Sequence, residues 1–260
     1  MGTVVKVTTN PPSGTVILDR PEKRNAISRA VLEELQQAFE DLHQERGVRA
    51  VILTGAGSCF CAGMDLEEMR LTAANPTRQA QWHQDAVSYK QLIETMLSFP
   101  KPIIAAVNGP VAAGGAGLVL AADTVVATGA AEFGLPEPRR GLVAGLVAPL
   151  LHFRVGGGIA ARLLLTSQMI SADQACKWNL YHELVEESVV WPRAHEIAQL
   201  CAESAPTSLQ LTKSLLNETI AETLSTMLSA GAAASATSRT TEAAAEGLAA
   251  FHEKRAPIWP

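Results

Sequence analysis

Residues 108–123 read NGPVAAGGAGLVLAAD, a segment in which four glycines lie among residues that are nearly all small or apolar. The segment follows an apolar run at 103–107, which predicts a buried strand, and continues into 118–122, which predicts a buried helix. A strand, a glycine turn and a helix start leave backbone N–H groups without partners at the helix N-terminus. Such a place binds an anion or stabilises a developing negative charge.

A single acid, Glu137, follows this segment in an apolar setting. Burial in such a setting would raise the pKa of the carboxyl and make it a usable base near neutral pH. The alternative is that Glu137 only caps a turn. Oxyanion donors beside one poorly solvated carboxylate would suit chemistry through an enolate. The residues around the acid are Phe133, Gly134, Leu135, Pro136 and Pro138.

A second segment, CFCAGMDL at 59–66, also follows a predicted strand and opens a predicted helix. The N–H groups near Met64 would therefore lack helical partners, although this segment alone favours an ordinary turn. Neither glycine segment fits a nucleotide-binding motif. Gly55-x-Gly57 has no third glycine at the required place, and no Lys-Ser/Thr pair follows residues 109–117.

Composition sets the class of protein. The chain has 260 residues, of which 47% are hydrophobic and 18% charged, so we expect a globular protein with one main domain and an appendage. A net charge of −5 without a basic tract argues against a nucleic-acid partner. No apolar run of about 18 residues and no signal-peptide pattern is present, so we expect no membrane span and a cytoplasmic location.

The four cysteines do not form a metal-binding pattern. Cys59 and Cys61 are spaced Cys-x-Cys, and Cys176 and Cys201 stand alone. Structural zinc sites usually use pairs with two to four residues between the cysteines, completed by a second pair or by histidines. We therefore expect buried thiols and no metal site.

Strands and helices are expected to alternate in the first part of the chain. Runs at 4–8 and 15–18 predict a hairpin, and Ser28 is a predicted N-cap for a helix to about residue 46. This order predicts mostly parallel strand pairing. Further strands are expected at 50–54, 103–107 and 124–128. Further helices are expected within 66–98 (loosened at 72–76) and at 159–166, 171–178, 189–204, 207–220 and along an alanine-rich stretch to 255.

Taken together, these segments resemble the crotonase family, also called the enoyl-CoA hydratase/isomerase family, over nearly the whole chain. The resemblance implies an α/β fold with a ββα spiral core at 1–200, which carries the site, and a helical trimerisation region at 201–260. It implies a homotrimer or a hexamer. The matching segments are 20–28 (a CoA loop), 48–55 and 60–66 (first oxyanion segment), 101–123 (second oxyanion segment), 133–137 (catalytic acid), and 164–172 and 251–259 (helical end).

The resemblance also implies a ligand and roles for named residues. The ligand is an acyl-CoA thioester, so coenzyme A is part of the substrate and no separate cofactor is expected. The thioester oxygen would lie between the N–H groups of Met64 and Gly114, with Glu137 as the catalytic acid or base. Arg24 would meet a CoA phosphate. Backbone contacts to CoA are implied around Ala26, Ala62, Asp65 and Leu66.

One departure from the family pattern bears on the reaction. Family hydratases use two glutamates, and the first would fall at position 117, where this chain has Gly117. Residues 141–144 also lack the Gly-Gly-Thr-Gln-Arg run common in hydratases. Water addition divides proton delivery and water activation between two acids, whereas a 1,3 proton shift needs one carboxylate. The resemblance therefore favours an enoyl-CoA isomerase, or an enzyme of another enolate reaction, with Glu137 as its lone base.

Two other functions stay open. A hydratase could take its second acid from Glu67, Glu68 or Glu132, and a non-catalytic member would bind acyl-CoA and act through its trimer surface. The RNA binding known in one branch of the family is disfavoured by the net charge of −5. Residues 71–98 are expected to shape the acyl pocket. Its candidate residues, each of which could equally belong to the core, are Trp82, Tyr89 and Met96.

Overall fold

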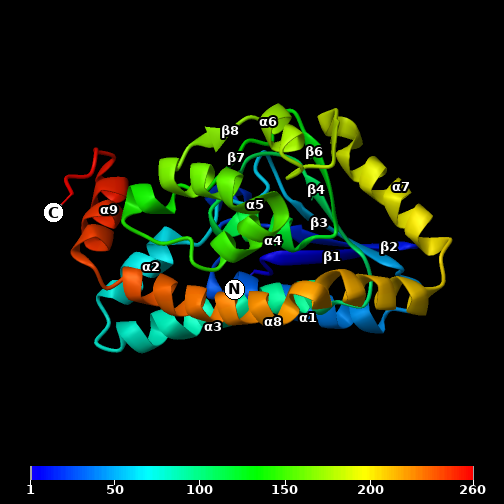
Figure 1. Cartoon of the computed structure of the whole chain (residues 1–260), viewed down its shortest axis with the longest axis horizontal. Helices are drawn as coiled ribbons and strands as arrows, with labels where there is room; N and C mark the ends of the chain where they lie inside the picture. The colour runs from blue at the N-terminus through cyan, green and yellow to red at the C-terminus, as the bar shows by residue number, and fades with distance from the viewer. Residues whose placement is uncertain (1, 260) are drawn as a thin grey trace.

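A six-stranded sheet with the order β1-β2-β3-β4-β6-β9 forms the centre of the fold (Figure 1). The computed structural model describes residues 2–259, apart from the side chains of 218–222. The first two strands form the predicted antiparallel hairpin, and each later strand pairs in parallel with its neighbour. The strands are β1 Val5–Asn10, β2 Ser13–Leu18, β3 Ala50–Gly55, β4 Ile103–Val107, β6 Thr124–Thr128 and β9 Glu183–Val185.

Helices cover both faces of this sheet, which explains why its central strands are apolar throughout. Side chains alternate along a strand, so on β3 Val51 and Leu53 enter the main core, whereas Ala50 and Ile52 pack against α7. The helices are α1 Arg29–Gln44, α2 Leu66–Ala73, α3 Arg78–Ser98, α4 Gly114–Ala121, α5 Val147–Thr166, α6 Ala172–Lys177, α7 Val190–Ala202, α8 Pro206–Ser238 and α9 Glu242–Glu253, with 3-10 turns η1 Pro21–Lys23, η2 Glu137–Arg140 and η3 Glu187–Val189.

A second, three-stranded sheet connects the glycine segment to the segment that carries Glu137. Its strands β5 (Val111–Ala112), β7 (Phe133–Gly134) and β8 (Met169–Ile170) have the order β5-β7-β8. The β5–β7 pairing is parallel. The Ala113 N–H donates to the Gly134 carbonyl at 3.0 Å, which brings the start of α4 close to Glu137. The sequence did not predict these two-residue strands, because pairing between distant segments defines them.

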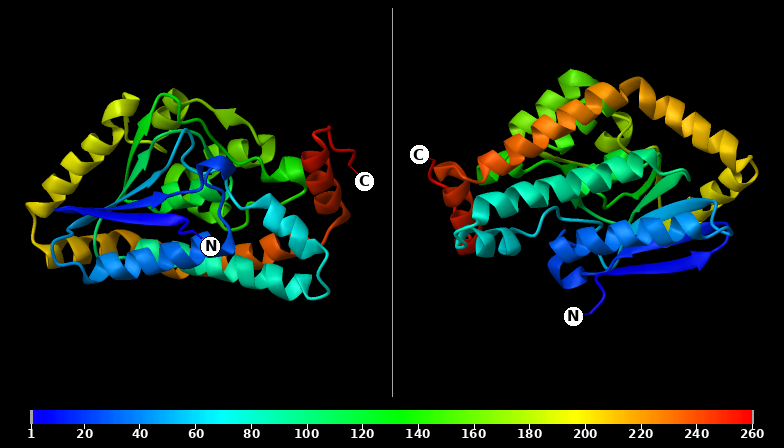
Figure 2. Two further views of the ribbon diagram at one scale, coloured as in Figure 1. Left: turned by 180° about the vertical axis from the view of Figure 1, so that it is seen from behind. Right: turned by 90° about the horizontal axis from the view of Figure 1, so that it is seen from below.

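Helices α3 and α8 pack side by side along the molecule (Figures 1 and 2). Lys213 fixes this packing, because its buried Nζ donates to the Met96 carbonyl at 3.1 Å and to Asp123 Oδ2 at 2.7 Å. The C-terminal end of α8 thereby reaches the part of α3 that follows α2. The division of the chain near residue 200 stays a prediction. No helix in the described part of the chain is long and apolar enough to cross a membrane.

Most predicted helices and strands are confirmed, with corrections at three helices. α4 begins at Gly114, not at residue 118. α5 begins at Val147, well before the expected 159, and is interrupted at Gly156, where φ is 74°. α8 continues past the expected end at residue 220 and stops at Ser238. Glycine lowers helix propensity by about 1 kcal/mol per residue, so tertiary packing decides where α4 begins.

Candidate active site

A cavity of about 420 Å³ opens where the N-terminal ends of α2 and α4 face η2, α3 and the end of α8. Strands and loops from distant parts of the sequence meet here. The structure therefore brings together every site residue expected from the sequence, whereas their contacts with CoA stay a prediction. These wall residues are Arg24, Ala26, Ala62, Met64, Asp65, Leu66, Gly114 and Glu137.

The N–H groups of Met64 and Gly114 are the two oxyanion donors expected from the sequence. Gly63 has φ +95°, and a Cβ at that residue would lie 3.1 Å from the Gly114 nitrogen. The segment around Met64 therefore lies directly against the start of α4, at a distance that only glycine allows. Within the described residues, neither N–H donates to another protein group.

Neighbouring backbone bonds leave both donors available. The Ile27 N–H donates to the Gly63 carbonyl at 2.8 Å, and the Asp65 N–H donates to the Ile27 carbonyl at 2.9 Å. This bridge uses the peptides on either side of Met64 but not its N–H. At α4, Ala113 has φ 51° and ψ −127°, a strained conformation for a residue with a side chain. This strained residue forms the turn that presents the Gly114 N–H at the start of α4.

Glu137 begins η2 and reaches the same cavity. Its Oε2 is buried and has no hydrogen-bond partner among the described residues. Burial raises the pKa of this carboxyl to about 7, partly opposed by a hydrogen bond from its own backbone N–H and, less, by the positive charge of Arg140. A carboxyl with this pKa exchanges its proton readily near neutral pH, so Glu137 has the properties of a general base.

The family profile named enoyl-CoA hydratase/isomerase matches residues 14–260. The chain belongs to the enoyl-CoA hydratase/isomerase family. A Thermus thermophilus protein that provisionally bears the name enoyl-CoA hydratase is 39% identical over 243 residues, which cover 93% of this chain and 95% of that protein. The 1,2-epoxyphenylacetyl-CoA isomerase of Escherichia coli is 30% identical over 244 residues, covering 94% and 93%.

Solved structures of this family share the fold. The crystal structure of an enoyl-CoA hydratase/isomerase from Xanthobacter autotrophicus Py2 has a TM-score of 0.89 and 27% identity, covering 97% of this chain and 94% of that chain. The α/β crotonase fold expected from the sequence is therefore confirmed. Relatives bear hydratase names as well as an isomerase name, so membership gives an enzyme of acyl-CoA thioesters but not the reaction.

Position 117, where family hydratases carry a glutamate, is closed by Tyr89. A Cβ at Gly117 would lie 2.1 Å from Tyr89 Oη and 3.2 Å from its Cζ. Tyr89 lies on the cavity wall, is only 3% exposed, and donates its O–H to the Gly114 carbonyl. Burial, with smaller contributions from Cys61 and then Glu137, raises the pKa of Tyr89 well above its usual value. A neutral phenol therefore fills the space that a second glutamate would need.

The other acids considered from the sequence have partners or lie elsewhere. Glu67 reaches the cavity wall but binds Arg70 at 2.6 and 2.9 Å, which lowers the pKa of this exposed carboxyl. Glu68 accepts a hydrogen bond from the Arg29 N–H at 3.1 Å. Neither Glu68 nor the exposed Glu132 is among the described residues of the wall.

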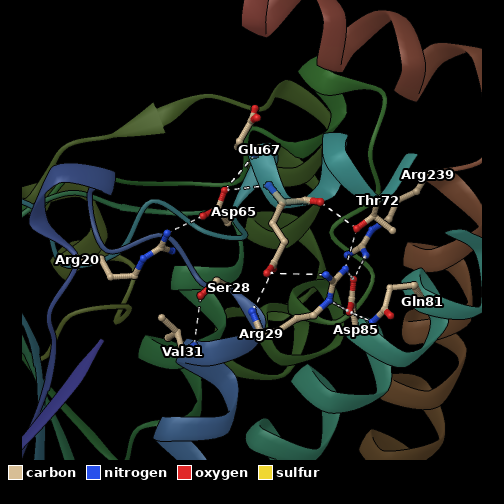
Figure 3. A network of polar contacts seen from close by, with 11 residues as sticks. Arg20, Ser28, Arg29, Val31, Asp65, Glu67, Thr72, Gln81, Asp85 and Arg239 are labelled. Carbon is tan, nitrogen blue, oxygen red and sulfur yellow. Dashed lines mark hydrogen bonds and ion pairs between the residues drawn. The ribbon is translucent and has the colours of Figure 1, made fainter. Parts of the chain in front are cut away.

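Two carboxylates that line the cavity are held by arginines (Figure 3). Asp65 binds Arg20 at 2.9 Å and also caps α2, accepting hydrogen bonds from the N–H groups of Glu67 and Glu68. Its side chain therefore shapes the oxyanion segment. Asp85 binds Arg29 with both carboxylate oxygens, at 2.7 and 2.9 Å.

Among the candidate acyl-pocket residues, Tyr89 lies on the wall, whereas Trp82 and Met96 are buried away from it. The α-helical spacing alone could not distinguish these cases. Sequence reasoning did not single out the other polar wall residues, because nothing local marks them. The described wall residues missed from the sequence include Asp85, Arg140, Ser235, Arg239, Phe251 and His252.

Proposed function

We propose that this enzyme shifts the double bond of an enoyl-CoA thioester from position 3 to position 2, with Glu137 as its base. The observation that carries this proposal is a carboxyl with one buried, unpartnered oxygen together with a closed position 117. Glu137 Oε2 is buried without a partner, and Tyr89 Oη lies 2.1 Å from where a side chain at Gly117 would begin. Of four wall acids, Asp65, Glu67, Asp85 and Glu137, only Glu137 has no arginine bound to it by a hydrogen bond.

One group is enough for the reaction. Glu137 takes a proton from C2, and the electron pair of that C–H bond forms a dienolate whose negative charge collects on the thioester oxygen. The N–H groups of Met64 and Gly114 stabilise that charge, an effect worth about 3–4 kcal/mol per donor in comparable sites. Glu137 then returns its proton to C4, and the double bond ends between C2 and C3.

The CoA part of the substrate would lie along the opening of the cavity. Lys23 and Arg24 line it there, and their cations suit the CoA phosphates. Backbone groups at Ala26 and Ala62 belong to the same wall. Coenzyme A arrives with the substrate, so the proposed reaction needs no further cofactor.

Hydration is the second candidate, and the names of several relatives favour it. The short-chain-enoyl-CoA hydratase of Clostridium acetobutylicum is 31% identical over 242 residues, covering 92% of this chain and 91% of that protein. A hydratase needs a second acid near the substrate. Of the acids weighed for this role, Glu67 lies on the described wall, and its bond to Arg70 argues against it.

The two reactions change absorbance in opposite directions. Isomerisation of 3-hexenoyl-CoA creates the conjugated thioester and raises its absorbance, whereas hydration of crotonyl-CoA lowers it. We expect the first signal, its loss in Glu137→Gln, and its retention in the control Glu132→Gln, which changes an exposed acid off the wall. Robust hydration without isomerisation would overturn the proposal. Binding of acyl-CoA without either reaction would favour a non-catalytic role.

A further inference from the structure

The cavity wall becomes polar between α3 and the end of α8. Asp85 lies one helical turn, about 5.4 Å, before Tyr89 on α3. Ser235 and Arg239 reach the same wall from α8. In Figure 3, Arg20 and Arg239 lie at opposite ends of one polar network, and Glu68 links the two ends because its N–H donates to Asp65 and its carboxylate accepts from the Arg29 N–H. A purely aliphatic acyl chain would not need charged groups here.

The carboxylate of Asp85, on this wall, already accepts three hydrogen bonds. Its Oδ1 accepts hydrogen bonds from Arg29 Nε at 2.7 Å and from Gln81 Nε2 at 2.8 Å. Its Oδ2 accepts a hydrogen bond from an Arg29 terminal nitrogen at 2.9 Å. That arginine also donates to Thr72 Oγ1 at 2.8 Å, so its position is fixed. The charge of Asp85 is therefore neutralised without Arg239.

Arg239, in contrast to Arg29, donates no side-chain hydrogen bond to a described residue. It is 8% exposed, and its closest carboxylate oxygen is Asp85 Oδ2 at 3.9 Å, beyond hydrogen-bond distance. Among the described residues, no acceptor takes a hydrogen bond from its guanidinium. A guanidinium carries five N–H donors, and burying it without acceptors is costly. Burial lowers the pKa of Arg239 for the same reason, although the group stays charged.

We propose that Arg239 binds a carboxylate at the end of the acyl group, so that the substrate class is a short dicarboxylic acyl-CoA thioester. This inference rests on the proposed acyl-CoA site. A carboxylate offers two oxygens that match the planar fork of a guanidinium, and it supplies the hydrogen-bond acceptors that Asp85, at 3.9 Å, does not. Tyr89 touches the Gly114 peptide, and Asp85, which lies beside Arg239, is one helical turn before it on α3, so a short acyl chain can lead from the oxyanion donors towards Arg239.

Binding of two saturated thioesters tests the proposal without any turnover. Glutaryl-CoA carries a terminal carboxylate on five carbons, and valeryl-CoA has the same length without it. We expect calorimetry to show that the wild-type protein binds glutaryl-CoA about tenfold more tightly than valeryl-CoA. A hydrogen bond to a charged group contributes at least the free energy that a tenfold difference in affinity requires. In Arg239→Met the preference should fall to within about twofold, and Arg239→Lys should keep part of it.

The control Arg78→Met should keep the full preference, because Arg78 is exposed on α3 and is off the described wall. Equal binding of both thioesters by the wild-type protein would overturn the inference, even if Arg239→Met did not fold. A preference that survives in Arg239→Met would also overturn it and would assign the carboxylate to Arg140 or Arg24, the other arginines on the wall.

Failure of the proposed reaction has a different signature. If neither thioester binds, the acyl-CoA site itself is wrong, and the inference about Arg239 falls with it. If glutaryl-CoA is preferred but no isomerisation of any 3-enoyl-CoA is seen, the inference stands and only the reaction is wrong.

Discussion

Burial of Glu137 gives the enzyme a predictable dependence on pH. The carboxyl has a pKa of about 7 in the folded protein, and only its ionised form can take a proton from the substrate. We therefore expect kcat/KM for 3-hexenoyl-CoA to rise with pH to a plateau, with a midpoint near 7. Initial rates measured between about pH 5 and 9 give this pH profile. A flat profile across this range would show that another group is the base.

The same burial makes Glu137 a source of instability at high pH. Its folded-state pKa of about 7 lies above its usual value of 4.5, so the folded protein holds the proton between these values more tightly than the unfolded chain. The free energy of unfolding therefore falls as pH rises through this window. We expect Glu137→Gln to stabilise the protein by roughly 1–3 kcal/mol at pH 8 and by little at pH 4.5.

Urea unfolding of wild type, Glu137→Gln and Glu132→Gln at these two pH values checks this expectation. Glu132 is exposed, so its substitution should give no pH-dependent gain. A gain of equal size at both pH values would mean that ionisation of Glu137 is not its cause.

Gly63 sets the distance between the two oxyanion donors. A Cβ there would lie 2.6 Å from the Ala113 Cβ, and φ of +95° is unfavourable for alanine. Gly63→Ala should therefore move the Met64 segment away from α4 and lower kcat by about 100-fold, the effect of losing one donor. Gly129→Ala is the matched control, since nothing lies within 4 Å of its Cβ position. Unchanged kcat in Gly63→Ala would contradict this account of the oxyanion site.

At the scale of elements, the contact between α3 and α4 decides how many acids the site can hold. Gly117→Glu alone should overpack this contact, at a cost of about 1–3 kcal/mol, because the new side chain meets the Tyr89 ring. The double variant Tyr89→Ala/Gly117→Glu makes room for a second carboxylate. We expect measurable hydration of crotonyl-CoA only in the double variant. Equal hydration by wild type and double variant would show that Tyr89 does not limit the reaction.

The starts of helices could be predicted from the sequence where a local capping residue determines them. Ser28 caps α1 by accepting a hydrogen bond from the Val31 N–H, and Ser171 caps α6 in the same way from Gln174. The start of α4 at Gly114 could not be predicted, because glycine disfavours helices. Packing decides it, since a Cβ at Gly115 would lie 2.5 Å from the Cys61 carbonyl oxygen.

At the scale of the whole molecule, the parts of the site that depend on packing between distant elements could not be predicted from the sequence. Glu137 and the segment around Met64 stand out from patterns within their own segments, whereas the resemblance to the family implied the roles of Met64 and Gly114. The closure of position 117 by Tyr89 and the approach of Arg239 to Asp85 depend on how α3 packs against α4 and α8. No spacing within either helix encodes that packing.

The last prediction concerns assembly. Leu211 and Leu215, one turn apart on α8, are 59% and 66% exposed, which is costly for a lone chain in water. They lie in the segment expected to form the trimer, so we expect sedimentation to give at least a trimer. Leu211→Asp/Leu215→Asp should reduce the mass, whereas Val7→Asp, an exposed change on β1, should not. A wild-type protein that sediments as a single chain at micromolar concentration would contradict this role of α8.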